Sequence, residues 1–103
     1  MSVKGQLNAC RDFLMAGMRA AGRGTTPNPE AGKLLRACLD LVEQLERQSE
    51  NVTTAEVETT LSVLNRAAAE LEQDETPGTT AVAAALRNAI GRMQSLRTEM
   101  TAK

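Results

Sequence analysis

A short stretch, GRGTTPNPEAGK (residues 22–33), contains the residue types that bind phosphate groups. In a loop of the form G-x-x-x-x-G-K-[ST], backbone N–H groups hold the phosphates, the lysine reaches the terminal ones and the hydroxyl binds Mg²⁺. Gly32 and Lys33 match this form, but Leu34 replaces the hydroxyl residue and Pro27 replaces the first glycine. We therefore interpret the stretch as a connector between helices and not as a phosphate site.

Two cysteines, Cys10 and Cys38, are the only residues with a thiol. Each cysteine is three or four residues from neighbouring leucines, which is the spacing of one face of a helix. Each therefore lies on an apolar stripe. They lack the C-x-x-C spacing of a redox motif, and buried reduced cysteines behave as small apolar residues. We predict that both are reduced core residues. The alternative is a disulfide or redox pair between neighbouring helices.

Carboxylates are plentiful, but the side chains that would turn them into a catalytic or metal site are missing. The chain has no histidine, tryptophan or tyrosine. This removes the usual near-neutral base, the commonest transition-metal ligand and the Glu-x-x-His pairs of a helical di-iron site. No nucleophile and base pair stands out, and we predict a protein that is not an enzyme and has no metal or cofactor.

Apolar residues recur at helical spacing in four windows, which predict helices over residues 2–21, 29–50, 54–73 and 80–101. The core has to be aliphatic, because Phe13 is the one aromatic residue. Leucine and alanine favour helices, and short links favour antiparallel neighbours. We expect an all-α protein, an antiparallel up-down-up-down four-helix bundle of two tandem helical hairpins, forming one domain over residues 1–103.

Local signals mark the starts of two of these helices. Asn28 is a good N-cap, and Pro29 suits the first helical position because its missing N–H needs no partner there. Thr53 and Glu56 have the spacing of a capping box, in which each side chain accepts a hydrogen bond from the other residue's backbone N–H.

Charge is unevenly distributed along the chain, although the net charge is only −1. Residues 1–36 carry six basic and two acidic side chains, residues 37–76 carry two basic and ten acidic ones, and residues 77–103 carry four basic and one acidic. The first and last helices of such a bundle are neighbours, so one side should be basic and the other acidic. Opposite charges would then flank the seams between helices, or the basic side would dock an acidic partner.

Several large apolar residues lie off the main stripes. Phe13 and Met15 fall on opposite flanks of the first stripe, and Leu39 and Val63 lie similarly off theirs. These residues either widen the core or leave an exposed patch around Phe13 and Met15, and large apolar residues in water mark binding surfaces.

These features together predict a small non-enzymatic protein that binds another protein, such as an acidic one, or itself. It would act as an adaptor, chaperone-like or inhibitor module through the first helix and its basic neighbour, the last. The candidate binding residues are Phe13, Met15, Arg11, Arg19, Arg87, Arg92 and Arg97.

Two alternatives remain open at this level. One is a nucleic-acid-associated accessory protein that uses the arginines of the first and last helices on phosphates, which near-zero net charge and the lack of aromatic residues among the arginines disfavour. The other is a self-assembling structural protein, including a homo-oligomer. Without an export signal or a membrane-spanning stretch, we expect a soluble cytoplasmic protein that does not bind a membrane.

Overall fold

The computed structural model describes residues 3–22, 29–48, 51–73 and 79–101, and four α-helices account for nearly all of them. They are α1 (Val3–Gly22), α2 (Pro29–Gln48), α3 (Thr54–Gln73) and α4 (Thr79–Thr101). Their ends lie within two residues of those expected from the sequence. The described residues contain no β-strand.

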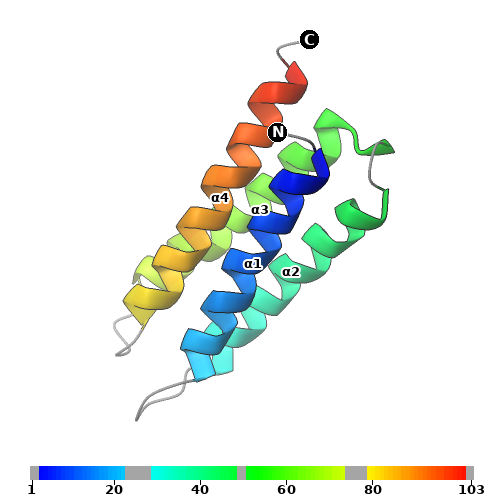
Figure 1. Cartoon of the computed structure of the whole chain (residues 1–103). Coiled ribbons are helices and arrows are strands. Elements are labelled where there is room, and N and C mark those ends of the chain that lie inside the picture. Colours follow the sequence, from blue (N-terminus) through cyan, green and yellow to red (C-terminus); the bar gives the residue numbers. More distant parts are fainter. Residues whose placement is uncertain (1–2, 23–28, 49–50, 74–78, 102–103) are drawn as a thin grey trace.

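The four helices pack as an elongated antiparallel bundle of 46 × 21 × 18 Å (Figure 1). Each of the helices α1 and α3 lies between α2 and α4, and the contact between α1 and α4 is the most extensive. The first residues of α1 and the last residues of α4 lie at the same end of the bundle. The predicted all-α, up-down-up-down four-helix fold is confirmed.

The local start signals act as expected where the structure describes them. Thr53 N donates to Glu56 Oε1 at 3.0 Å, and Glu56 N donates to Thr53 Oγ1 at 3.2 Å, which completes the capping box of α3. The backbone hydrogen bond from Thr53, with weaker ones from side chains, lowers the pKa of Glu56. Pro29 opens α2, whereas Asn28 lies outside the described residues.

The core is aliphatic throughout, as the composition requires. Leucines from all four helices meet at its centre with no exposed surface, and Met93 and Ile90 fill the space beside them. The fully buried leucines are Leu7, Leu14, Leu35, Leu64, Leu86 and Leu96. Burying each such side chain stabilises the fold by about 1.5–3 kcal/mol, so the bundle depends on this set.

The buried arcs are wider than the predicted stripes. Leu39 is buried although its position lies off the main stripe of α2, whereas Leu41, expected on that stripe, is only half-buried. The reason is that α2 contacts α1 on one side and α3 on the other, so its buried surface extends around the helix. Val63 packs against the core from the flank of α3, and so does Phe13 from the flank of α1.

Gly17 marks the closest approach of α1 to its neighbours. A methyl group placed on this residue would lie 2.9 Å from Leu35 Cδ1 on α2 and 3.2 Å from Ala85 Cβ on α4. Leu35 has no exposed surface and therefore little room to move away. Glycine costs a helix interior about 0.5–1 kcal/mol relative to alanine, but at this position it lets three helices meet.

We expect Gly17→Val to lower the free energy of unfolding by about 1–3 kcal/mol, because the added methyl groups overpack the junction of α1, α2 and α4. Gly32→Val is the matched control, since nothing lies within 4 Å of a Cβ at that position on α2. The control should change stability by less than about 0.5 kcal/mol. Urea unfolding followed by circular dichroism measures both, and equal stability of the two variants would contradict this packing.

Candidate functional site

The glycine-containing stretch is divided between two helices at its ends. Gly22 is the last residue of α1, whereas Gly32 and Lys33 lie inside the first turns of α2. Lys33 Nζ lies 3.7 Å from Glu30 Oε1, one turn earlier on the same helix. Residues 23–28 lie outside the described part of the chain. Gly32 and Lys33 therefore belong to a regular helix and not to a loop that could surround a phosphate.

One of the candidate arginines, Arg11, lies on the seam between α1 and α2. Arg11 Nη1 donates to Glu46 Oε2 at 3.3 Å, and the Glu46 side chain is 15% exposed. A charge-assisted hydrogen bond of this kind is stronger when water is largely excluded from it. Arg11 therefore links α1 to α2, and 37% of its side chain remains exposed.

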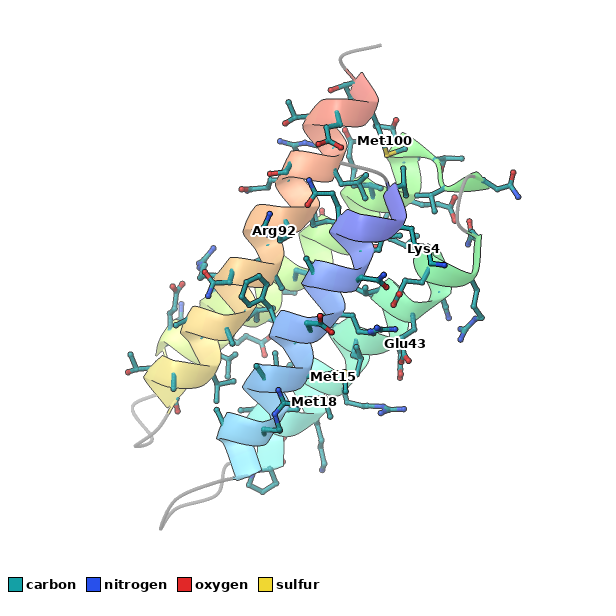
Figure 2. All side chains as sticks on the ribbon, viewed as in Figure 1. Lys4, Met15, Met18, Glu43, Arg92 and Met100 are labelled. Carbon is teal, nitrogen blue, oxygen red and sulfur yellow. The ribbon has the colours of Figure 1, made fainter. Side chains whose placement is uncertain are left out.

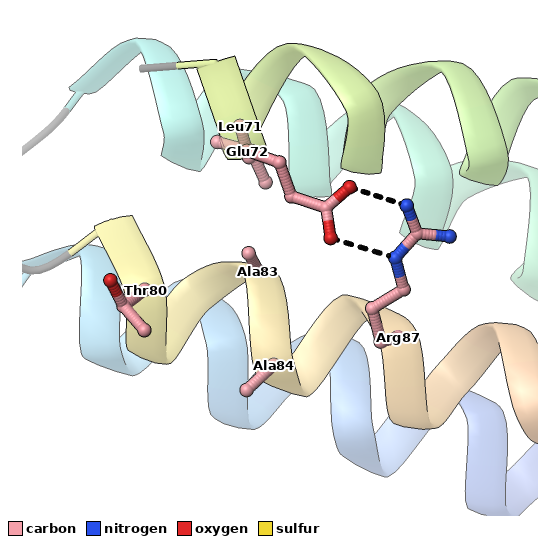
Figure 3. Close-up of a pocket in the computed structure, with 6 residues that line it drawn as sticks. All are labelled: Leu71, Glu72, Thr80, Ala83, Ala84 and Arg87. Atoms are coloured by element: carbon pink, nitrogen blue, oxygen red, sulfur yellow. Dashed lines mark hydrogen bonds and ion pairs between the residues drawn. The ribbon is translucent and has the colours of Figure 1, made fainter. Parts of the chain in front are cut away.

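Arg87 does the same on the seam between α3 and α4 (Figure 3). Its Nε donates to Glu72 Oε2 at 3.1 Å and its Nη2 donates to Glu72 Oε1, which makes a bidentate pair. The hydrogen bond from Arg87 lowers the pKa of Glu72. Beside the pair is a hollow of about 330 Å³ between the two helices, lined by Leu71 and small residues of α4.

A second hollow lies where α1 and α4 meet at the surface, and we call it the α1/α4 groove. It has a volume of about 290 Å³. Its lining residues are Phe13 from α1 and, from α4, Arg87, Asn88, Gly91, Arg92 and Ser95. Phe13 and two arginines, Arg87 and Arg92, thus border the same space, and no acidic residue is among the described residues that line it. The guanidinium of Arg87 is paired with Glu72 across the seam between α3 and α4.

Arg92 differs from the two seam arginines. It is exposed on the outward side of α4, as Figure 2 shows, and it makes no ion pair or hydrogen bond through its side chain with the described residues. The groove therefore has one guanidinium, that of Arg92, free to pair with an external anion.

The remaining candidates lie outside the groove. Met15 is two positions from Phe13, which turns it about 200° around the helix, and at 41% it is the most exposed large apolar side chain among the described residues. Arg19 and Arg97 are exposed on α1 and α4 and do not line the hollow. The structure thus brings together Phe13, Arg87 and Arg92 around one hollow. Met15 lies apart from Arg92 (Figure 2).

Sequence reasoning did not single out Asn88, Gly91 and Ser95. A signal for them exists, because their spacing of three and four residues places them on one face of a helix, opposite the apolar stripe. All three are exposed. The spacing alone did not indicate a binding site, because the sequence does not show that Phe13 of α1 lies beside this face of α4.

Cys10 and Cys38 are free thiols with no exposed surface. Burial raises the pKa of Cys10 from 9.0 to about 12, with smaller contributions from Cys38 and Glu46, and burial raises the pKa of Cys38 to about 11. Because the thiolate is the reactive form, neither residue is suited to redox or nucleophilic chemistry at neutral pH.

The described residues offer no further site of another kind. Within those residues, no group of three or more cysteine, aspartate or glutamate side chains is arranged to hold a metal ion. None of the helices, over the same residues, has the length and apolar content needed to cross a bilayer. No protein-family model, no curated protein and no solved structure matches this chain.

The buried thiols predict a specific dependence of stability on pH. Both remain protonated in the folded state above pH 9.0, whereas in the unfolded state they ionise near that value. The unfolded state then binds fewer protons, so the free energy of unfolding should fall as the pH rises from about 9 toward 11.

A double variant, Cys10→Ala with Cys38→Ala, should show a smaller fall over the same range. All other ionisable groups are the same in both proteins, so their contributions cancel in the comparison. Urea unfolding at several pH values measures the slopes, and equal slopes would show that the thiols are not buried as described.

Proposed function

We propose that this protein is a non-enzymatic binding module that attaches to another protein through the α1/α4 groove, as an adaptor, chaperone-like or inhibitor module. The observation that carries the proposal is the juxtaposition of Phe13 with Arg92 around one open hollow. Aromatic residues and arginine are the side chains most enriched at the centres of protein interfaces.

The other reactive side chains among the described residues support a binding role over catalysis. The two thiols are buried and have raised pKa values. Two carboxylates beside the candidate arginines, Glu46 and Glu72, serve as partners in ion pairs between helices. Neither arrangement offers an activated nucleophile beside a base.

The pairing of arginines also favours a protein partner over nucleic acid. Arg11 and Arg87 are each engaged by a glutamate, which leaves fewer free cations to neutralise phosphates. Affinity for nucleic acid depends on the number of such contacts, and single-strand binding adds aromatic stacking, for which Phe13 is the one candidate.

Affinity capture from a lysate of the cells that make the protein tests this proposal. The bait is compared with Arg92→Glu, which reverses the charge of the groove, and with Arg66→Glu, which makes the same charge change at an exposed position on α3. The lysate is treated with nuclease and kept at moderate salt.

We expect one stoichiometric protein to be captured by the unmodified bait and by Arg66→Glu, and to be lost with Arg92→Glu. A partner that both variants lose equally, or that both retain, would contradict docking at the groove. Recovery that disappears on nuclease treatment would favour the nucleic-acid alternative.

A further inference from the structure

Gly91 has no internal reason to be a glycine. It is exposed in the interior of α4, and no atom of the described residues lies within 4 Å of where its Cβ would be. Gly17, by contrast, is required by the contact with Leu35 and Ala85. A glycine inside a helix lowers the stability of the fold. At Gly91 this loss is not offset by a closer contact with another described residue. A bare backbone at this position permits the close approach of another backbone from outside.

The charges around Gly91 indicate what could approach. Arg92 is adjacent to it, and Arg87 lies one turn earlier on α4. The described residues that line the groove include Arg92, whose guanidinium is unpaired, and Arg87, whose guanidinium is paired with Glu72, but no acidic residue. A partner with carboxylates complements this surface, and a basic partner would be repelled.

A second copy of the chain, bound symmetrically, fits less well. A two-fold interface uses the same residues on both subunits, so an interface centred on Gly91 would bring the two Arg92 side chains together. No carboxylate lines the groove to separate them. Like charges at the centre of an interface disfavour that arrangement.

We infer that the α1/α4 groove binds an acidic amphipathic helix of the partner protein. The backbone of this helix passes close to Gly91, one of its apolar side chains lies against Phe13, and one of its carboxylates pairs with Arg92. This is the helix-in-groove mode of recognition, in which apolar residues spaced three and four apart supply the anchors. The inference rests on the proposed function and adds the chemistry of the partner's binding element.

A displayed library of helix-forming peptides of about 18 residues, randomised on every face, provides a probe that does not require the natural partner. The immobilised protein selects from it, and the enriched peptides are then measured for affinity against three variants. These are Arg92→Glu, Gly91→Gln, which places a long side chain over the groove, and the control Gly32→Gln, which fills open space on α2 instead. Circular dichroism should show that both glutamine variants melt at or above the temperature of the unmodified protein.

We expect the enriched peptides to be acidic and amphipathic, and to bind more weakly as salt is raised. Their affinity should fall at least about tenfold with Arg92→Glu and with Gly91→Gln, and should be unchanged with Gly32→Gln. Enrichment of neutral, basic or extended proline-rich peptides, absence of enrichment, or affinity that Gly91→Gln leaves intact would each overturn the inference.

Two further outcomes separate this inference from the proposed function. If the captured protein partner depends on Arg92 but the library yields no acidic helix, the proposed function stands and the inference fails. If sedimentation shows a dimer of this chain that Gly91→Gln abolishes, a second copy occupies the groove and the inference is overturned.

Discussion

The contact of Gly17 with Leu35 and Ala85 sets how closely α1 approaches both α2 and α4. Because α1 lies between these helices, its distance from each also fixes which residues reach the surface where α1 and α4 meet. Phe13 lies one turn before Gly17 on α1, and it is half-buried beside α4 as a result. A larger residue at position 17 would push α1 away from α2 and α4. The same movement would expose part of the core and change the shape of the α1/α4 groove.

Electrostatics organises the outside of the same framework. The basic helices α1 and α4 each face a more acidic neighbour across one seam, where Arg11 meets Glu46 and Arg87 meets Glu72. The exposed pair of Arg87 with Glu72 adds little to stability, but pairs across the seams favour one pairing of helices over others. Among the described residues, the free guanidinium of Arg92 lies beside the ring of Phe13, where the two basic helices α1 and α4 are adjacent. The uneven charge along the chain thus gives the groove its basic character.

The architecture was predictable because its signals are local. Helical periodicity gave the four helices, and the capping box of Thr53 and Glu56 is formed as its spacing predicts. The groove was only partly predictable. Phe13 and Arg92 were candidates by residue type, but their juxtaposition, like the separate positions of Gly17 and Gly91, depends on how the helices pack. A single glycine in a helical pattern cannot reveal whether it faces another helix or open space.

The packing of α1 against both α2 and α4 is tested most directly by the nuclear Overhauser effect between the Gly17 Hα protons and the methyl groups of Leu35 and Ala85. The structure predicts strong cross-peaks to both residues, because all three helices meet at Gly17. Cross-peaks to only one of them, or to neither, would place α1 away from α2 or α4. The groove, and the binding function proposed for it, would then have to be abandoned.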